Sequence, residues 1–429
     1  MTTRTRRARR HVLCITALLL LGTLHSIAGA AELLVWTNFG PTTPHGQALA
    51  ALVERFNAEH PDIKVTLDVM SGNFEEKVVL AYTTGVAPDV IIGGVARYAL
   101  EFGGEGGMFL PLDGYIDGPN GFPRDAFVPD MWVNSIVDGK AYQLALDGNE
   151  RALIINADAA LAAGLDVTQP EPVRNWDDLL DWARKLTRQS GDETVQWGFH
   201  AHQQNGGDRL HWMWLNGGRI WSDDTLEARL DDPRNVEALR FAADMIHTYR
   251  VAPAPGGYSG TAIANFRSGR FAMIIGSSNN VEALERDGFN FITVAGPPGW
   301  GEEPGRFSGA TSSTIQIMSS TQHPDEAWTF VRYLAYERAS DITAYSGIPY
   351  LIESLQDARF QRQPWQAFVT SIMTLAARNH LVKGLDGTAF FALTDGAWTS
   401  VMRGEKDAEI ALKEANGPLG AMRAEWGNR

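Results

Sequence analysis

Two acidic residues, Asp147 and Glu150, are the side chains best spaced for chemistry in this sequence of 429 residues. Two carboxyls that face each other can act as general acid and general base, as they do in glycoside hydrolysis. Polar residues are also expected wherever a chain turns between two strands, and that structural interpretation suits the segment 147–151 better. Acid–base catalysis by this pair stays open as the less favoured alternative.

The common catalytic and cofactor motifs are missing from the sequence. It has no GxxxxGK[ST] phosphate loop, no HExxH zinc motif and no GxSxG nucleophile elbow. Its ten histidines form no cluster with acidic residues at metal-ligand spacing. The sequence therefore predicts no cofactor and no metal site, and it offers little that is specifically catalytic.

Binding features are more prominent, and they are polar side chains next to aromatic rings at the ends of predicted strands. They comprise Asn38-Phe39, Asn73-Phe74, the segment 147–151 and the run Gly276-Ser277-Ser278-Asn279-Asn280. In open α/β sheets, ligands collect at such carboxyl ends of strands. Sugars suit this mixture, because their C–H faces pack on aromatic rings while each buried hydroxyl needs a hydrogen-bond partner.

The first 30 residues differ from the rest in charge and in cysteine content. They contain five arginines, no acidic residue, the single cysteine Cys14, an apolar run from Val12 to Leu24 and the small residues Ala28-Gly29-Ala30. This order is typical of a signal peptide, here cleaved near Ala30, so we expect a periplasmic protein. The remaining chain has 32 basic and 51 acidic residues, a net charge of −19 and no cysteine. Its acidity disfavours a nucleic-acid partner, and its lack of thiols excludes disulfides and zinc-thiolate sites.

The hydrophobic pattern that follows alternates between strands and helices. An apolar strand at 33–36 precedes a helix with Leu49, Leu52, Val53 and Phe56 on one face, and an alternating strand follows at 63–69. A helix over 74–84 and the apolar strand 90–92 complete a β-α-β-α-β order. That order predicts an α/β protein with a parallel sheet.

Extended segments at 142–146 and 152–155 mark the expected passage to a second lobe. Helices are expected there around Trp176, Trp212 and Val236, and from Pro324 onward, with the chain mostly helical to its end. The expected strands of this part are 196–199, 271–275, 291–294 and 314–318.

Taken in order, short segments spread over nearly the whole chain after the leader resemble the sugar-binding type of bacterial extracellular solute-binding proteins of ABC importers. The maltose-binding and glycerol-phosphate-binding proteins belong to that family. The matching segments include Leu52-Val53-Glu54-Arg55-Phe56-Asn57, Gly85-Val86-Ala87-Pro88-Asp89-Val90, Asn175-Trp176-Asp177-Asp178-Leu179, Phe266-Arg267-Ser268-Gly269-Arg270-Phe271 and Pro324-Asp325-Glu326-Ala327-Trp328.

The resemblance implies the two-lobed periplasmic-binding-protein fold of type II, in which each lobe is a sheet flanked by helices. It also implies crossing hinge strands, a ligand in the cleft between the lobes and closure of the lobes on binding. The expected division is a signal peptide at 1–30, an N-terminal lobe of 31–147 plus 293–321, and a C-terminal lobe of 148–292 plus 322–429.

The resemblance further implies a set of ligand-binding positions, carried over one at a time. Phe74 stands where the glycerol-phosphate binder has a tyrosine, Arg97 stands where relatives use a tryptophan or an acid, and Phe390 offers a further ring. The whole expected set is Asn38, Phe39, Asn73, Phe74, Arg97, Asp147, Arg151, Asn205, Asp208, Trp212, Ser277, Ser278, Asn279, Gly309, Thr311 and Trp398.

The leading interpretation is a monomeric receptor, not an enzyme, that captures a sugar and delivers it to the membrane permease of an ABC importer. A glycerol-phosphate or polyol-phosphate receptor is the main rival, but a phosphate needs several cationic donors, and only Arg97 and Arg151 are placed to help. The third interpretation is a secreted glycoside-processing enzyme that uses Asp147 with Glu150 or Asp208. It requires two carboxyls about 5–10 Å apart.

Overall fold

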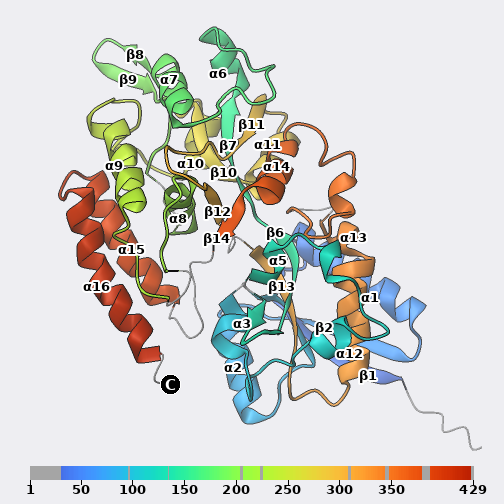
Figure 1. The fold of residues 1–429 in the computed structure, drawn as a ribbon. Coiled ribbons are helices and arrows are strands. Elements are labelled where there is room, and N and C mark those ends of the chain that lie inside the picture. The colour runs from blue at the N-terminus through green and yellow to red at the C-terminus, as the bar shows by residue number, and fades with distance from the viewer. Residues whose placement is uncertain are drawn as a thin grey trace, which may run out of the picture.

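The computed structural model describes residues 30–94, 97–133, 135–202, 206–222, 226–307, 311–343, 347–378 and 387–426. Figure 1 shows two lobes, each built on a β-sheet with helices around it. The two-lobed α/β architecture expected from the sequence is confirmed.

The sheet of the first lobe has the strand order β2-β1-β3-β13-β6. Strands β1 (Ala31–Thr37), β2 (Ile63–Val69) and β3 (Val90–Gly94) run parallel. Strand β13 (Thr311–Ile317) is antiparallel to both β3 and β6 (Leu144–Gly148). The run Val90-Ile91-Ile92 is fully buried because its side chains enter hydrophobic cores on the two faces of the sheet.

Helices α1 (Pro44–Glu59) and α2 (Phe74–Thr84) connect the parallel strands. The Oγ1 atom of Thr43 accepts a hydrogen bond of 3.1 Å from the Gly46 amide, and Pro44 fills the first helical position, so α1 begins sharply at this point. Helix α2 ends at Gly85, whose φ of +76° is the left-handed conformation that glycine adopts readily.

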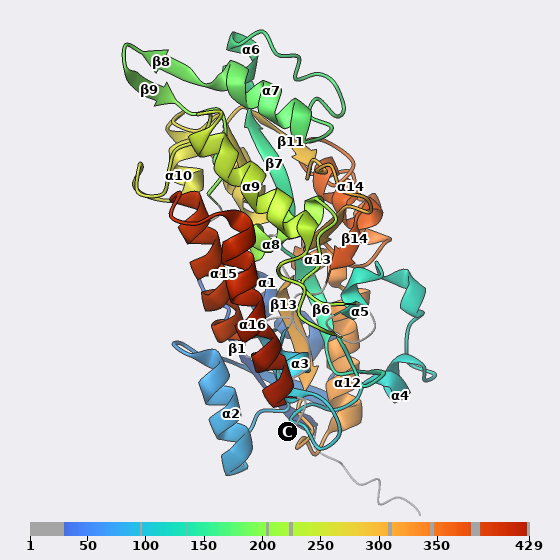
Figure 2. The same ribbon diagram turned by 60° about the vertical axis from the view of Figure 1, so that its left-hand side comes forward.

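The sheet of the second lobe places β7 (Arg151–Asn156) between β10 (Met273–Ser277) and β11 (Phe291–Ala295). Both neighbours are antiparallel to β7. Two long helices, α15 and α16, pack against each other and against α9 along one side of this lobe (Figure 2). The helices of this lobe are α6 (Ala157–Ala162), α7 (Trp176–Leu186), α8 (Gly206–Leu215), α9 (Pro233–His247), α10 (Ala262–Arg267), α11 (Ser278–Arg286), α14 (Gln366–Thr374), α15 (Gly387–Met402) and α16 (Ala408–Trp426).

Short elements complete the described chain. The helical ones are α3 (Arg97–Phe102), α4 (Asp113–Ile116), η1 (Arg124–Ala126), α5 (Asp130–Val133), α12 (Pro324–Arg332), the π-helical turn η2 (Tyr333–Glu337), α13 (Ala339–Thr343) and η3 (Ser354–Gln356). The strands are β4 (Ile136–Val137), β5 (Lys140–Ala141), β8 (Arg188–Ser190), β9 (Glu193–Gln196), β12 (Gly305–Phe307) and β14 (Ala376–Arg378).

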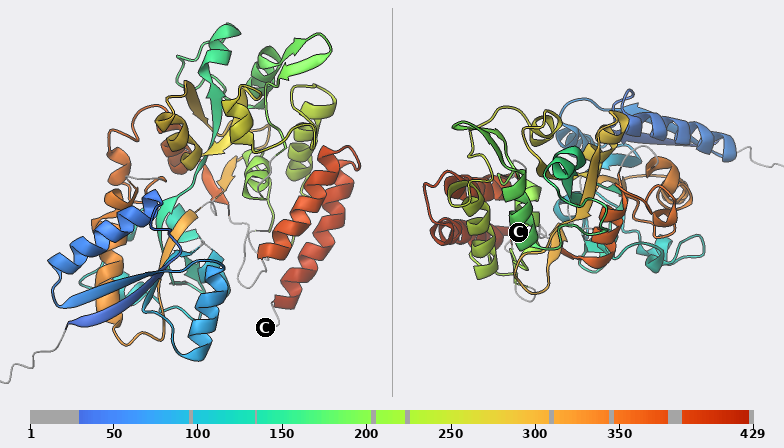
Figure 3. Two further views of the ribbon diagram at one scale, coloured as in Figure 1. Left: turned by 180° about the vertical axis from the view of Figure 1, so that it is seen from behind. Right: turned by 90° about the horizontal axis from the view of Figure 1, so that it is seen from above.

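The described residues lie on both sides of three passages between the lobes (Figure 3). The first passage runs from β6 to β7, and the second runs from β11 toward β13. The third is the segment 347–366. Ile348 of this segment exchanges two backbone hydrogen bonds of 2.8 Å with Gly148 of the first lobe. In the second lobe, the Gln363 Oε1 atom of this segment accepts a hydrogen bond of 3.1 Å from the Thr293 amide.

The packing differs from two of the lobe boundaries expected from the sequence. Strand β11 pairs with β7 over Phe291–Ala295, so residues 293–295 belong with the second sheet and not with the first. Helix α12 packs on β13 and β1, and α13 packs on β6, so residues 324–343 lie with the first lobe and not with the second. Residues 348–352 also lie with the first lobe, because Ile348 pairs with Gly148 and Leu351 pairs with Phe127. We propose the remaining boundaries as expected from the sequence.

Most expected elements match the observed ones, with two differences. The strand expected at 196–199 ends at Gln196, and Trp197 forms only an isolated bridge to Phe271. The C-terminal part is less helical than expected, because residues 347–365 contain only the short helix η3, and because β14 is a strand that pairs with β12. Among the described helices, none combines the length and the apolar character needed to cross a membrane.

Candidate ligand-binding site

Asp147 lies on β6 next to the passage between the lobes, and it is only 1% exposed. A hydrogen bond of 2.7 Å joins its Oδ2 atom to the Nε2 atom of His45, the second residue of α1. Burial by itself lowers the pKa of His45. The hydrogen bond to Asp147 and the negative charges of Asp147 and Glu282 outweigh that effect, so the pKa is raised above its ordinary value.

The third passage between the lobes encloses Asp147 from another side. Gly347 has a φ of +84°, and a Cβ atom there would lie 3.0 Å from the Asp147 Oδ2 atom. A Cβ on Gly148, the residue after Asp147, would lie 3.1 Å from the hydroxyl of Tyr350 in the same third passage. The carboxylate is therefore fixed by close packing as well as by His45.

The loop after β1 lies against the end of β3. A Cβ atom on Gly93 would come within 2.1 Å of the Asn38 Oδ1 atom and 3.2 Å of a ring carbon of Phe39. The ring of Phe39 lies 5.0 Å from that of His45, measured between centroids. Asn38 is exposed and Phe39 is half-buried, so both add polar and aromatic surface beside the His45–Asp147 pair.

Arg151 begins β7 on the second-lobe side of the passage, and its side chain is 9% exposed. Its guanidinium donates a hydrogen bond to Asp208 in the first turn of α8, and another to the Asn149 carbonyl oxygen. The positive charge of Arg151 is therefore already compensated within the protein.

Residues 277–279 lie where β10 turns into α11. Ser277 is the cross-strand partner of Arg151, and it begins α11 through a reciprocal capping interaction with Asn280. Ser278 is fully buried, and its Oγ atom donates a hydrogen bond of 3.4 Å to the Asn149 Oδ1 atom. Asn279 is exposed at the same helix end.

Half of the expected site residues thus gather around the first passage between the lobes, which we call the junction. They are Asn38, Phe39, Asp147, Arg151, Asp208, Ser277, Ser278 and Asn279. Together they offer carboxylate, amide and hydroxyl groups next to an aromatic ring. Such groups hydrogen-bond a polyhydroxylated ligand without requiring a metal or a redox group.

Residues 40–339 of the chain match the family of bacterial extracellular solute-binding proteins. The chain belongs to this family.

Several members of the family are similar to this solute-binding protein over much of its length. A putative binding protein of Brucella abortus is 25% identical over 368 residues, which cover 84% of this chain and 86% of that protein. The arabinooligosaccharide-binding protein of Bacillus subtilis is 26% identical over 242 residues, which cover 54% of this chain and 51% of the relative.

A solved structure supports the same fold. The cyclic alpha-maltosyl-1,6-maltose binding protein of Arthrobacter globiformis superposes with a TM-score of 0.76 at 21% identity. The superposition covers 92% of this chain and 99% of that structure.

Two expected site residues of this solute-binding protein have structural roles away from Asp147. The Asn73 Oδ1 atom caps α2 by accepting a hydrogen bond of 3.4 Å from the Glu76 amide. Phe74 is 5% exposed and packs in a hydrophobic core with Val78 and Ile91. A ligand contact at either residue stays a prediction.

The expected stacking rings of the second lobe are buried. Trp212 is 1% exposed, stacks on Trp176 with 4.5 Å between ring centroids, and donates a hydrogen bond of 2.9 Å to the Ala238 carbonyl oxygen. Trp398 and Phe390 are fully buried on α15. These rings pack the core of the lobe in this structure.

Four expected positions are only partly described or not described. The backbone of Arg97 begins α3 and that of Thr311 begins β13, whereas their side chains lie outside the described part. Asn205 and Gly309 lie outside the described residues, as does the expected signal peptide up to residue 29.

Three further side chains at the junction were missed by the sequence interpretation: His45, Glu282 and Phe391. His45 was inconspicuous in a loop, although the Thr43-Pro44 pair before it signals a helix start at this point. Glu282 on α11 is half-buried, and burial raises its pKa, although the charges of Arg359, His45 and Arg286 oppose that rise. Phe391 on α15 is half-buried, and a Cβ on Gly206 at the start of α8 would lie 2.3 Å from its ring.

The described surface also has a hollow of about 290 Å³ between α15 and α16. It is lined mainly by small and apolar side chains such as Ala392, Gly396 and Ala411, and it contains none of the junction residues. Its polar lining side chains are Ser400, Lys406 and Glu414, and the last two are paired with each other, so we place the candidate site at the junction and not in this hollow. The described residues contain no group of three or more acidic, histidine or cysteine side chains that could hold a metal ion.

Proposed function

We propose that this solute-binding protein captures a neutral sugar, either a monosaccharide or an oligosaccharide, in a cleft between its two lobes. The observation that carries the proposal is the cluster at the passage from β6 to β7. There Asp147, Arg151 and Ser278 come from both lobes, with Phe39 beside His45, the partner of Asp147, and Phe391 beside the helix of Asp208.

The charges at the junction favour a neutral sugar over a phosphorylated polyol. A phosphate is bound best by several uncompensated cationic donors. In the described part of the junction, Arg151 is neutralised by Asp208 and His45 by Asp147. The carboxylates and the serine hydroxyls instead match the hydrogen-bonding needs of sugar hydroxyls.

The same pairing disfavours glycoside hydrolysis. A hydrolase of this type needs one protonated carboxyl group and one free carboxylate that face each other. Asp147 and Asp208 are each bound to a cationic side chain, and Glu150 is 2% exposed. We therefore propose a receptor without catalytic activity.

The proposed setting follows from the N-terminal segment and from the family. The basic, apolar and small residues of the first 30 positions support export through a signal peptide cleaved near Ala30. We propose that the exported protein is a periplasmic monomer and that it delivers its sugar to the membrane permease of an ABC importer. The named sugar receptors among its relatives support this assignment.

A thermal-shift screen against sugars, polyols and their phosphates tests the proposal, because a ligand that binds only the folded state raises the unfolding midpoint. We expect neutral sugars to raise the midpoint and glycerol phosphate to leave it unchanged. A midpoint that rises with glycerol phosphate and with none of the neutral sugars contradicts the proposal.

A further inference from the structure

One oxygen of the Asp147 carboxylate is held by a side chain of the protein itself. The Asp147 Oδ2 atom lies 2.7 Å from the His45 Nε2 atom, and Gly347 passes so close that a Cβ atom there would lie 3.0 Å from the same oxygen. The side chain of Asp147 is 2% exposed, whereas that of His45 is 17% exposed. A buried carboxylate requires hydrogen-bond donors in place of water, and His45 is one of them.

The place of His45 in the fold fixes its ring beside Asp147. His45 is the second residue of α1, directly after Pro44 at the first helical position, and Thr43 caps this helix start. The ring of His45 also lies against that of Phe39, with 5.0 Å between the centroids. All of these residues belong to the first lobe, so the hydrogen bond between His45 and Asp147 is a feature of that lobe alone.

Burial and charge act on the His45 ring in opposite directions. Burial, the largest single influence, disfavours the charged imidazolium, and the N-terminal end of α1 disfavours it too. Among the described residues, Asp147 and Glu282 on α11 are the charged groups that favour it, and Asp147 also does so through its hydrogen bond. Together they outweigh the burial, so the pKa of His45 is raised.

We propose that the sugar competes with His45 for the carboxylate of Asp147, so that capture of the sugar releases a proton from the histidine. This inference rests on the proposed function, with Asp147 as the contact of a sugar hydroxyl. A hydroxyl that donates to Asp147 offsets part of the negative charge that holds the imidazolium. The sugar also covers the part of the His45 side chain that is still exposed, and burial favours the neutral ring.

The proton passes from the ring to the solvent, while His45 Nε2 keeps its hydrogen bond to Asp147. The sugar thus binds the neutral ring more tightly than the charged one, and it lowers the pKa of His45 in the complex. Affinity should rise as the pH rises through the pKa of His45, by about tenfold for each unit by which the sugar lowers that pKa. At higher pH the ring is neutral with and without the sugar, so no proton is released.

An NMR titration of the imidazole signals tests the pair without a sugar. The signal of His45 is the one that disappears in His45→Gln. We expect it to titrate above the ordinary value of about 6.5 in the unaltered protein. Asp147→Asn removes the hydrogen-bonded carboxylate and should lower the pKa of His45. A pKa of His45 that is the same in both proteins overturns the proposal.

Calorimetric titration with the neutral sugar that raises the unfolding midpoint most tests the competition itself. Titrations in two buffers of different ionisation enthalpy count the protons released. We expect release of part of a proton per sugar near neutral pH, none at about pH 9, and about tenfold higher affinity at about pH 9 than at about pH 6. His45→Gln, which keeps a neutral donor for Asp147, should release no proton and bind equally well at both pH values.

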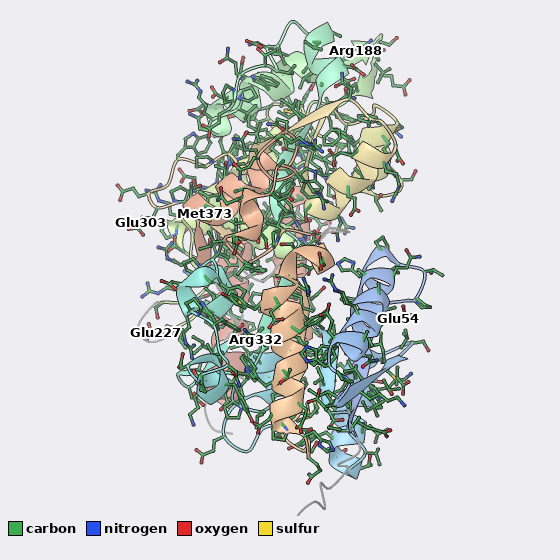
Figure 4. All side chains as sticks on the ribbon, turned by 90° about the vertical axis from the view of Figure 1, so that its right-hand side faces the viewer. Glu54, Arg188, Glu227, Glu303, Arg332 and Met373 are labelled. Atoms are coloured by element: carbon green, nitrogen blue, oxygen red, sulfur yellow. The ribbon has the colours of Figure 1, made fainter. Side chains whose placement is uncertain are left out.

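Two variants of α1 are matched controls. His60→Gln removes the histidine at the other end of the helix, about 20 Å from His45, where its ring stacks on Phe56 with 4.4 Å between the centroids. Glu54→Gln removes a charge from the exposed outer face of the helix, which Figure 4 shows at the side of the first lobe. Both variants should release as much proton as the unaltered protein.

The outcomes separate this inference from the proposed function. Sugar binding without proton release, or release that persists in His45→Gln, overturns the competition and leaves the sugar receptor intact. Absence of binding by every neutral sugar overturns the proposed function, and the competition with it.

Discussion

The Nε2 atom of His45 lies 2.7 Å from the Oδ2 atom of Asp147, although the two residues are 102 positions apart in the chain. This contact joins the first turn of α1 to the end of β6, at the point where the chain leaves the first lobe. A ligand that hydrogen-bonds Asp147 must therefore share its carboxylate with His45. Affinity for the ligand and the protonation of His45 are coupled at this pair.

The first prediction concerns Gly93→Ala. The new Cβ would displace Asn38 and Phe39, so we expect the affinity for the sugar to fall about tenfold, as for the loss of one hydrogen bond. Gly164→Ala is the matched control, because its φ of +76° imposes similar backbone strain with no atom within 4 Å of the new Cβ. Titration of tryptophan fluorescence measures both affinities. Unchanged affinity in Gly93→Ala means that Asn38 and Phe39 do not contact the ligand.

The second prediction separates the capping role of Asn73 from a ligand contact. Asn73→Ala removes the cap of α2, so we expect the free energy of unfolding to fall by about 0.5–2 kcal/mol with the sugar affinity unchanged. Urea denaturation and a binding titration of the same variant decide between the two roles. A loss of affinity at unchanged stability would show that Asn73 binds the ligand.

The third prediction concerns stability in acid. Burial, together with the charge of His202, lowers the pKa of His200 to about 3. The unfolded chain takes up a proton at this residue below about pH 6.5, whereas the folded chain does not. Stability is therefore lost as the pH falls below that value, at about 1.4 kcal/mol per pH unit for this group.

His200→Gln removes the buried imidazole. The free energy of unfolding should then depend less on pH, by about 1.4 kcal/mol per pH unit, when urea denaturation is compared at about pH 6.5 and about pH 5. The Tyr258 hydroxyl pairs with His200 Nε2 at 2.5 Å, and the glutamine side chain offers it an amide partner instead. An equal pH dependence in the variant and in the unaltered chain argues against a buried neutral His200.

The elements with local signals were predictable from the sequence. Helix α2 matches the expected residues 74–84, because Asn73 starts it and Gly85 ends it. The apolar run 90–92 predicted a strand buried on both faces. The third passage between the lobes was not predictable, because the contacts of Gly148 with Ile348 and of Thr293 with Gln363 join segments that are far apart in the sequence.

The candidate site was predictable only in part. Asp147 and Arg151 were recognised from the polar turn between two extended segments. The histidine that holds Asp147 was missed, because no local pattern connects position 45 to position 147. The ligand contact expected of Trp212 stays a prediction, because an aromatic residue near a polar loop has the same sequence pattern whether it faces a ligand or, as in this structure, packs on Trp176.

The most direct test of a sugar receptor built around Asp147 is a calorimetric titration of the unaltered protein and of Asp147→Asn with the sugar that stabilises the protein most. The exposed Asp192→Asn serves as the control for a lost charge elsewhere. We predict one sugar bound per chain, with affinity weakened in Asp147→Asn by about 1.5–3 kcal/mol and unchanged in Asp192→Asn. Equal affinity of Asp147→Asn and the unaltered protein, or binding of a phosphorylated polyol and of no neutral sugar, would contradict the account.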